Sequence, residues 1–480
     1  MSAPSVALPG IGLRTLRAVR PRPRPRELSL LILVGLTLVA GSVSLGATER
    51  FEAAGAAVSG TGSAFALANP GQLVVYLGAL LLAHLAQVVA GRRTDELLLP
   101  AVGMLGGISL LLMERLPQSL AGQLGGLADT QLVWLVLAVA IVTSLAVVVR
   151  SDGWLRRYKY SWAAAGILLL LATFVLGRDV NGARLTLALG PISVQPSELL
   201  KAILVVFLAG YLSEFRPLLV EQSWRVGPFR LPPVPYLAPM VAMWAIALGI
   251  VVVERDLGAA LLFFAVFLLL LYIATARAIY VAAGIVAFVA GAALMYRVFG
   301  VVQTRVDVWI NPWADPLGAG YQQIQALYAF GRGGLLGTGL GAGLPIVGGR
   351  LPIPAVHTDF PFAALGEELG LVGVLAILGL YLVVIERGLR IAAAAADDFR
   401  ALLAAGLSLV VGVQAFIIAG GNLKLIPLTG ITLPFISYGG SSLVTNAVVV
   451  GLLLALSDRG VEPPPPRRAG RIRRLFRAPA

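Results

Sequence analysis

Two ionisable residues with helical spacing, Glu198 and Lys201, stand in an apolar stretch of this 480-residue chain. Because they are three residues apart, their side chains share one face of a helix and can form an ion pair. The helix-start signal at Pro196 and Ser197 does not explain Lys201. An ionisable residue one turn into an apolar helix usually faces a polar cavity, so the pair is a candidate site, with structural pairing as the alternative.

The stretch 299–359 carries the densest polar chemistry. Asp315 stands directly before Pro316, where a plain Asx turn would account for it. A glycine-rich run at 331–349 lacks the preceding strand and the Gly-Lys-Ser/Thr of a phosphate loop, so tight backbone packing is favoured. Arg332 is the one charge in that run able to hold a phosphate.

Further candidates follow towards the C-terminus. His357 and Asp359 have no third ligand in a metal-binding pattern, so we predict no metal centre there. Glu367 and Glu368 point roughly 100° apart on a helix, and a structural ion pair is the favoured interpretation. Ser437 could be a nucleophile only beside a base at a defined spacing, and the sequence shows none.

The elements that position these residues must be membrane helices. The chain is 58% hydrophobic and 13% charged, with a mean hydropathy of +0.88. Soluble domains have about 25% charged residues. The absence of Cys excludes disulfides, thiolate zinc sites and cysteine nucleophiles. The net charge of +13 lies where it fits a membrane surface, so we predict lipid contact and no nucleic-acid partner.

Apolar runs predict an all-α polytopic membrane protein with about twelve spans, since each span needs roughly 20 apolar residues. The runs are 28–48, 71–91, 97–113, 132–149, 161–177, 199–213, 234–253, 257–275, 278–298, 360–385, 401–420 and 441–457. Alternating strand patterns of the barrel type are absent from the sequence.

The distribution of basic residues predicts the orientation. With the N-terminus inside, the inner segments carry 26 of the 37 Lys and Arg residues, so both termini are predicted to be cytoplasmic. The basic, Pro-rich ends 1–27 and 458–480 are predicted to be tails on anionic lipid. The polar stretches then share the outer face: 178–198, 254–256, 299–359 and 421–440. The last of these is too rich in Pro and Gly for a continuous helix, so we expect it to re-enter the bundle.

Eight motifs then occur in order, and together they resemble the SEDS family (shape, elongation, division and sporulation), which contains RodA and FtsW. They are Asn181-Gly182-Ala183-Arg184, Gln195-Pro196-Ser197-Glu198-x-x-Lys201, Asp256-Leu257-Gly258, Asp315-Pro316-x-Gly318-x-Gly320-Tyr321-Gln322, Gly331-Arg332-Gly333, His357-Thr358-Asp359-Phe360, Gly366-Glu367-Glu368-Leu369-Gly370 and Pro427-Leu428-Thr429-Gly430 through Ser437-Tyr438-Gly439-Gly440-Ser441-Ser442.

The resemblance covers roughly 95–457 and implies a ten-helix SEDS core, with two extra N-terminal helices in 28–94 and a large outer loop at 299–359. Two motifs depart from the family pattern. Its usual Arg-Trp-Ile is Arg184-Leu185-Thr186 here, and its usual Gln-Pro-Asp-Leu-Gly is Glu254-Arg255-Asp256-Leu257-Gly258. The second variant, the extra helices and the short basic tail make the chain more similar to RodA than to FtsW.

The resemblance also implies a function. Such proteins are peptidoglycan glycosyltransferases that polymerise lipid II at the outer face of the cytoplasmic membrane, for cell elongation and shape, together with a class B penicillin-binding protein. A lipid II flippase and a non-catalytic cell-wall scaffold are the alternatives. A polymerising enzyme would make glycan strands by itself when purified, whereas a flippase would form no bond.

The family's essential aspartate maps onto Asp315, which we expect to act as general base. The leaving diphosphate needs cations, and the remaining expected contacts are with substrate. A divalent ion, Mg or Mn, could share the charge, and we expect no other cofactor. The expected substrate-binding residues are Arg184, Glu198, Lys201, Arg332, His357, Asp359, Lys424 and Ser437.

Overall fold

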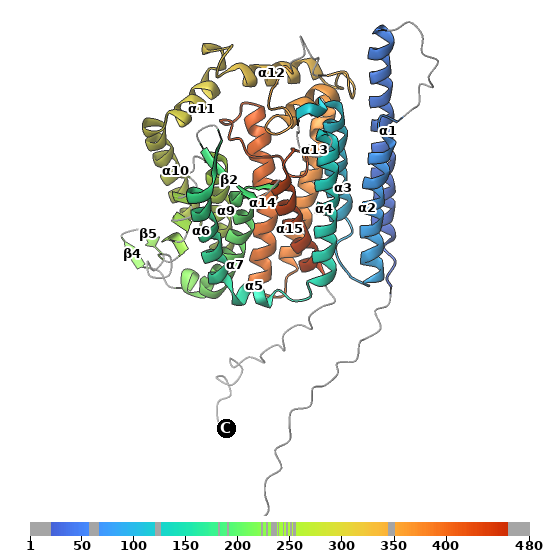
Figure 1. Cartoon of the computed structure of the whole chain (residues 1–480). Coiled ribbons are helices and arrows are strands. Elements are labelled where there is room, and N and C mark those ends of the chain that lie inside the picture. Colours follow the sequence, from blue (N-terminus) through green and yellow to red (C-terminus); the bar gives the residue numbers. More distant parts are fainter. Residues whose placement is uncertain are drawn as a thin grey trace, which may run out of the picture.

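The computed structural model describes residues 21–56, 67–120, 126–180, 183–189, 192–221, 224–226, 229–231, 256–343 and 351–458, with scattered positions between 238 and 252. Long helices form a single bundle (Figure 1). Its first half contains α1 (Pro25–Ala56), α2 (Pro70–Val89), α3 (Leu98–Arg115), η1 (Gln118–Leu120), α4 (Leu127–Val148), α5 (Gly153–Arg157), α6 (Lys159–Leu176) and α7 (Pro196–Glu221). Its second half contains α9 (Leu257–Thr275), α10 (Ala278–Val298), α11 (Gly300–Ile310), η2 (Pro312–Ala314), α12 (Tyr321–Gly333), α13 (Pro361–Ala393), α14 (Asp398–Asn422) and α15 (Gly440–Ser457).

The prediction of a helical polytopic membrane protein is confirmed. Ten helices in the described part of the chain are long and apolar enough to cross a membrane. The expected span at 161–177 corresponds to α6, whose apolar stretch Lys159–Thr173 is shorter. The expected span at 234–253 lies largely outside the described residues, so the number of twelve stays a prediction.

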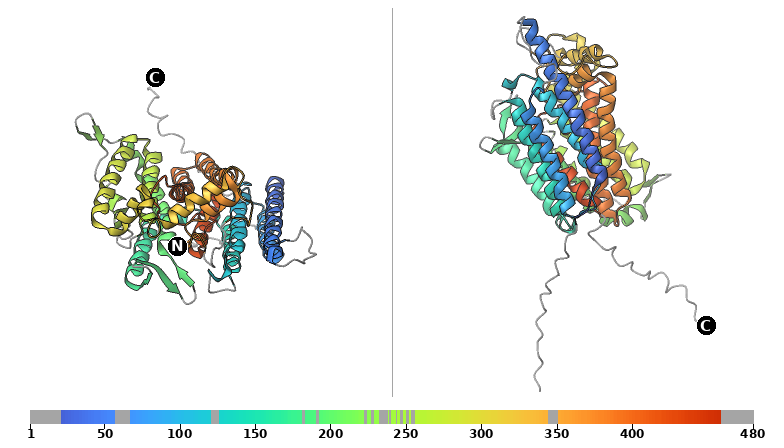
Figure 2. Two further views of the ribbon diagram at one scale, coloured as in Figure 1. Left: turned by 90° about the horizontal axis from the view of Figure 1, so that it is seen from above. Right: turned by 90° about the vertical axis from the view of Figure 1, so that its right-hand side faces the viewer.

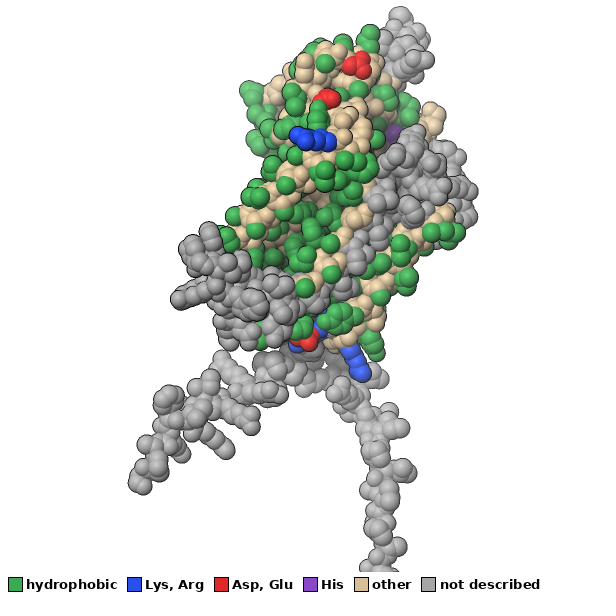
Figure 3. Space-filling model, turned by 90° about the vertical axis from the view of Figure 1, so that its left-hand side faces the viewer, with side chains coloured by type: hydrophobic (Ala, Val, Ile, Leu, Met, Phe, Trp, Pro, Cys, Tyr) green, Lys and Arg blue, Asp and Glu red, His purple; other side chains and the backbone are tan. Residues whose placement is uncertain are grey.

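The centre of the bundle is α14, which packs against α7, α9, α13 and α15. In its most apolar window 72% of the residues are buried, compared with none in the corresponding window of α10. On the face drawn in Figure 3, hydrophobic side chains cover the middle, and charged side chains lie towards both ends. This distribution is what a bilayer requires, because lipid tails solvate apolar side chains and exclude unpaired charges.

The two N-terminal helices lie against one side of the bundle (Figures 1 and 2), where α1 packs on α3 and α2 packs on α4. Two glycines of α3 permit the close approach. A Cβ at Gly107 would lie 2.2 Å from a methyl carbon of Leu38, and one at Gly106 would lie 2.4 Å from the hydroxyl of Tyr76. Small residues at such contacts let membrane helices gain packing contacts between their backbones.

Helix α13 is broken at Gly370, where φ is 65° and ψ is −169°. The glycine-rich chain after α12 packs into this break, and a Cβ at Gly337 would lie 2.2 Å from the Glu368 carbonyl oxygen. Leu371 N–H donates to the Gly334 carbonyl at 3.0 Å, so α13 gains a partner where its own ladder is interrupted. The interpretation of these glycines as packing positions is therefore confirmed.

Two small antiparallel sheets were not predicted from sequence. β1 (Arg178–Val180), β2 (Ala183–Leu189) and β3 (Ile192–Val194) form one, and β4 (Trp224–Val226) and β5 (Phe229–Leu231) form the other. The chain before α3 meets the end of α15 at the α5 end of the bundle, where Arg92 donates to the Asp458 carboxylate at 2.7 Å. Which side of the membrane this end faces remains a prediction.

Candidate active site

Asp315 lies in the turn that joins η2 to α12, at the end of the bundle opposite α5 (Figure 1). Its carboxylate accepts hydrogen bonds from the main-chain N–H groups of Gly318, at 3.1 Å, and Ala319, at 2.9 Å. The side chain is otherwise exposed. Asp315 therefore stabilises its own turn, as an Asx-type residue does. The remaining lone pairs of its carboxylate are exposed and free to accept further hydrogen bonds.

A cavity of about 230 Å³ adjoins this turn. We call it the Asp359 cavity, since the carboxylate of Asp359 is its acidic group. Helix α11, the start of α12 and the non-helical chain between α14 and α15 form its walls, and we call that chain (residues 423–439) the re-entrant segment. The lining residues are Thr304, Arg305, Val308, Trp309, Ala319, Gln322, Gln323, Asp359, Phe360, Ile426, Leu428 and Gly430. Ala319, which donates to Asp315, connects the cavity to the turn.

Electrostatics in this cavity favour a carboxyl group that titrates near neutrality. Burial raises the pKa of Asp359 to about 6, although the charge of Arg305 and a hydrogen bond with Thr358 oppose the rise. Burial lowers the pKa of Arg305, while Asp256 and Asp359 act in the opposite direction. Arg305 also donates to the Thr429 carbonyl at 2.8 Å, which fixes the guanidinium against the re-entrant segment.

Lys424 lies beside the Asp315 turn. Its Nζ is 5.1 Å from the centre of the Trp313 ring and 3.4 Å from the Ile310 carbonyl oxygen. The indole N–H of Trp309 donates to the Lys424 carbonyl at 3.2 Å. The expected meeting of the 299–359 and 421–440 stretches at one site is thus present.

Glu198 and Lys201 form the expected pair, inside the bundle on α7. The Lys201 Nζ lies 2.6 Å from the Glu198 carboxylate and 2.8 Å from the Gln414 side-chain oxygen. Gln414 in turn donates to the Thr432 carbonyl at 2.8 Å. Lys201 is buried and does not line the Asp359 cavity. It belongs to a buried polar cluster that contacts the re-entrant segment through Gln414.

Asp256 has the capping role that its position before Leu257 allows. Its carboxylate accepts from Ala259 N–H at 3.0 Å as the N-cap of α9. It also accepts from the Ser197 hydroxyl at 2.8 Å, which links the starts of α7 and α9. These contacts bring two motifs together that are 59 residues apart in sequence.

His357 and Ser437 hold the 299–359 and 421–440 stretches together. Tyr438 N–H donates to the His357 carbonyl at 2.8 Å, and the rings of these residues lie 5.8 Å apart. The Ser437 hydroxyl donates to the Thr358 carbonyl at 2.7 Å and accepts from Leu433 N–H at 2.8 Å. Burial lowers the pKa of His357. No group of three or more potential metal-binding side chains occurs among the residues that the structure describes.

Arg332 is 42% exposed and donates to the Glu367 carboxylate at 2.8 Å, while Arg115 approaches Glu368 to 3.8 Å. Glu367 and Glu368 therefore each form an ion pair within the bundle, which is the interpretation that the sequence favoured. Arg332 does not line the Asp359 cavity. Arg184 lies on β2 opposite Asp179, but its side chain is outside the described residues.

Three residues of this region were missed from sequence: Arg305, Gln414 and Asn422. Asn422 donates to the Asp359 carbonyl at 2.9 Å and so fixes the backbone of that residue. Gln414 and Asn422 are polar residues near the end of an apolar run, and that was an available signal. Arg305 lies on a helix within a stretch treated as a loop, so its direction could not be inferred.

Comparison with known proteins agrees with this arrangement. A family model described as "Cell cycle protein", for FtsW, RodA and SpoVE, matches residues 96–460. The chain belongs to this family. The protein named peptidoglycan glycosyltransferase RodA in Mycobacterium tuberculosis (strain ATCC 25618 / H37Rv) is 41% identical over 387 residues, which are 79% of this chain and 81% of that relative. A probable peptidoglycan glycosyltransferase FtsW from Nitrosococcus halophilus is 42% identical over 301 residues, 60% of this chain and 72% of that protein.

Solved structures show the same architecture. The crystal structure of the rod shape determining protein RodA of Thermus thermophilus has a TM-score of 0.53 and 25% identity, and covers 76% of this chain and 97% of its own. A chain from a structure described as a peptidoglycan synthase complex that coordinates polymerization and crosslinking has a TM-score of 0.59 and 27% identity. That match covers 76% of this chain and 98% of the other.

Proposed function

We propose that this chain, a peptidoglycan glycosyltransferase of the RodA and FtsW family, polymerises lipid II into glycan strands for cell elongation and shape. The observation that carries the proposal is the cavity beside the Asp315 turn, where Asp359 and Arg305 meet at one end of a membrane bundle. The enzyme is a multi-pass membrane protein, and we place this end at the outer face of the cytoplasmic membrane. A substrate anchored in that leaflet would then reach the cavity from the side.

The reaction joins a sugar hydroxyl to an anomeric carbon that carries a lipid diphosphate. The attacking oxygen forms the new bond as its proton passes to a carboxylate, and the old bond breaks with its electron pair on the diphosphate. We assign the general base to Asp315, whose exposed carboxylate is already oriented by two N–H groups. Asp359, facing the adjoining cavity, is assigned to hold the acceptor sugar. Single-step displacement inverts the anomeric carbon and gives a β-linked polymer from an α-linked donor.

The leaving diphosphate requires positive charge. Arg305 lines the cavity and Lys424 lies beside the turn, so these two are the first candidates. Lys201 and Arg332 are already paired with Glu198 and Glu367, and we assign them to keeping the site in shape. The contributions of Arg184, His357 and Ser437 to substrate binding stay proposals.

A divalent ion, Mg or Mn, would fit the carboxylate and diphosphate oxygens present when substrate is bound. Because no cluster of three ligating side chains occurs in the described part of the chain, such an ion would take most of its ligands from the diphosphate. No step is assigned to it here.

The partner that we propose is a class B penicillin-binding protein, which would crosslink the strands that this chain makes. The likeness to a chain of a complex that combines polymerization and crosslinking supports this pairing. We further propose that residues 95–457 form the catalytic core, and that the two helices of 28–94 are an addition packed on its side.

The deciding experiment compares Asp315→Asn with the wild type in polymerisation of purified lipid II, with and without the partner. We expect a fall of about 10²- to 10⁴-fold, the range that a general base contributes. Asp307→Asn is the matched control, because Asp307 is an exposed aspartate on α11 that bonds to Tyr296 and does not line the cavity. Thermal unfolding checks that each variant is folded.

Full turnover by a folded Asp315→Asn variant would remove Asp315 as the base. If purified protein moves lipid II across vesicles and forms no strands, the flippase alternative holds. If every aspartate variant is silent except in partner binding, the scaffold alternative holds.

A further inference from the structure

A second polar cavity, of about 530 Å³, lies at the α5 end of the bundle, opposite the proposed catalytic site. We call it the basic cavity. It lies between the start of α1, the chain before α3, the end of α13, the start of α14 and the end of α15. Its charged lining consists of Arg26, Arg93, Arg387, Arg390 and Arg400, with Asp95, Glu96 and Asp458.

The charges in this cavity leave an excess of arginine. Asp95 already accepts from Arg387 at 2.8 Å, and Asp458 accepts from Arg92 at 2.7 Å. Arg390 pairs with Glu386, and Arg400 pairs with Asp152 at 2.8 Å, so the excess rests on Arg26 and Arg93, with Glu96 as the remaining acidic residue of the lining. Within the described residues, no carboxylate pairs with Arg26 or Arg93, and both are exposed. The cavity therefore presents unpaired guanidinium groups, which bind phosphate with directed hydrogen bonds.

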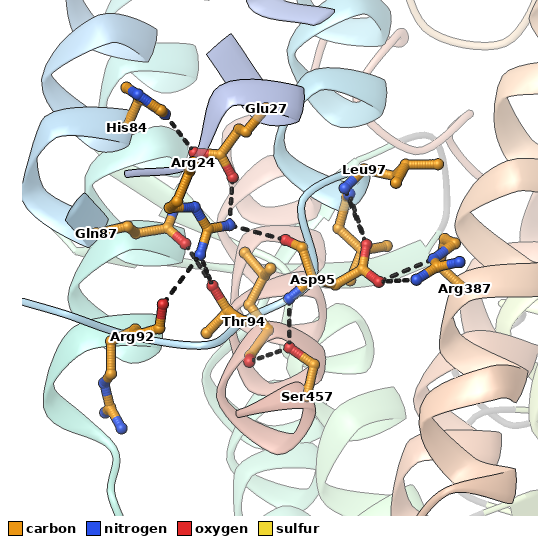
Figure 4. A network of polar contacts seen from close by, with 12 residues as sticks. Arg24, Glu27, His84, Gln87, Arg92, Thr94, Asp95, Leu97, Arg387 and Ser457 are labelled. Atoms are coloured by element: carbon orange, nitrogen blue, oxygen red, sulfur yellow. Dashed lines mark hydrogen bonds and ion pairs between the residues drawn. The ribbon is translucent and has the colours of Figure 1, made fainter. Parts of the chain in front are cut away.

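A buried network fixes the chain next to Arg26 and Arg93 (Figure 4). Arg24 donates to the Thr94 hydroxyl at 2.6 Å and to the Asp95 carbonyl at 3.0 Å, and it also pairs with Glu27. Asp95 N–H donates to the Ser457 hydroxyl at 2.9 Å. The chain that carries Arg93 is thus tied to α1 and α15.

An apolar groove of about 470 Å³ continues from the basic cavity along α1, α3 and α13. Leu97 lines both spaces. Arg26 is one turn before Leu30 on α1, and Arg387 is one turn after Val383 on α13. The apolar groove therefore starts one helical turn from the arginines of the basic cavity. Glu368 is the charged residue of the groove's lining and lies towards its opposite end, where Arg115 approaches it to 3.8 Å.

We infer that the basic cavity and the apolar groove together form a binding site for an anionic glycerophospholipid of the leaflet at the α5 end. Its phosphate would lie between Arg26 and Arg93, and an acyl chain would fill the groove between α1 and the core. Charge complementarity and the shared wall at Leu97 favour an anionic lipid, because a zwitterionic lipid has no net negative charge to neutralise the excess positive charge of the cavity. Such a lipid would connect α1 to the core.

The test measures lipid binding to the purified full chain in detergent by native mass spectrometry, with phosphatidylglycerol and phosphatidylcholine as probes. We expect tighter binding of phosphatidylglycerol by tenfold or more, from a contribution of about fivefold per arginine. The double variant Arg26→Gln with Arg93→Gln should bring phosphatidylglycerol binding down to the phosphatidylcholine level. The matched control is Arg156→Gln with Arg157→Gln, two exposed arginines of α5 outside both spaces.

Equal losses in both double variants would show general surface charge and overturn the site. So would unchanged binding in the Arg26 and Arg93 variant. Thr37→Trp provides a second route should that variant not fold, since Thr37 is exposed in the groove and a large ring there would exclude an acyl chain. If the site binds lipid, Thr37→Trp should weaken the binding of phosphatidylglycerol. If phosphatidylglycerol binding is unchanged and glycerol phosphate binds equally to the wild type and to Thr37→Trp, the cavity is a site for soluble phosphate and the lipid proposal is overturned.

Discussion

Two polar clusters, the Arg24 network at the α5 end of the bundle and the Asp315 turn at the opposite end, hold their charges by different means. At the α5 end, Arg24 is buried between Glu27, Thr94 and the Asp95 carbonyl, and the Asp95 carboxylate receives Arg387. At the opposite end, Asp315 is held by two main-chain N–H groups and stays exposed. A charge whose partners are all protein groups can only hold helices together, whereas a charge with free lone pairs beside a cavity can meet a substrate.

By the same criterion we expect Lys201 to act as a structural charge, whereas its position in the sequence predicted contact with substrate. Its Nζ is shared between Glu198 and Gln414, and the side chain is buried. Removing one member of such a cluster leaves an uncompensated polar group. The comparison therefore separates residues whose loss unfolds the protein from residues whose loss only inactivates it.

The largest effect is expected for Arg24→Met, which deletes the charge of the buried network and keeps much of the side-chain volume. Breaking a buried pair costs about 3–5 kcal/mol, because Glu27 and the Asp95 carbonyl lose their donor. Denaturant unfolding in detergent should show this loss in the free energy of unfolding. Protein that remains folded should polymerise at a rate close to that of the wild type.

Arg156→Met is the control for Arg24→Met, because Arg156 is exposed at the same end of the bundle. We expect a change within about 0.5 kcal/mol. Equal stability of the two variants would mean that the network contributes nothing beyond surface charge, and the contrast between the two ends would then fail.

The sequence predicts the membrane helices well because the length of a span follows from the thickness of the bilayer alone. The orientation inferred from the basic residues stays a prediction. The sequence also predicts that a glutamate at 367 or 368 needs a charged partner, and the Arg332–Glu367 ion pair confirms this. Pairs such as Asp95 with Arg387, 292 residues apart, depend on which helices become neighbours, and periodicity carries no such information.

The active-site prediction has the same limit. The predicted topology places Asp315, Asp359 and Lys424 on one face of the membrane, and the structure brings their segments to one cavity and its adjoining turn. Arg305 was missed because the 299–359 stretch was treated as a loop, while the structure contains α11 there. A helix of 11 residues is too short to be recognised as a span, so neither of its faces could be assigned.

Asp359→Asn is expected to have an effect of intermediate size. It should raise the free energy of unfolding, whereas Arg24→Met lowers it. Since the pKa of Asp359 is raised to about 6 in the folded protein, the folded state holds its proton more tightly than the unfolded chain. The free energy of unfolding therefore falls as the pH rises from about 4 to 6, and it stays lower above that window. At pH 7 the amide should raise it by on the order of 2 kcal/mol.

The same Asp359→Asn variant should polymerise about tenfold more slowly at pH 7, because it loses a hydrogen bond from a charged group to the acceptor. Wild-type activity should decline as the pH drops below about 6, and this decline should be absent in the variant. The Asn422 contact reaches the carbonyl of residue 359 and survives the substitution. A variant that is both less stable and fully active would place Asp359 with the structural charges.

The smallest effect is expected for Lys424→Gln, and it tests whether the rim of the site differs from the cavity. Lys424 is only half-buried beside the Trp313 ring, so water and salt screen its attraction for a diphosphate. We expect polymerisation to fall about two- to fivefold at low ionic strength and less at high ionic strength. Lys424→Arg keeps the charge and should retain the salt dependence of the wild type. A loss as large as that of Asp315→Asn, and independent of salt, would instead place Lys424 against the reacting atoms, where its charge would be shielded from bulk water.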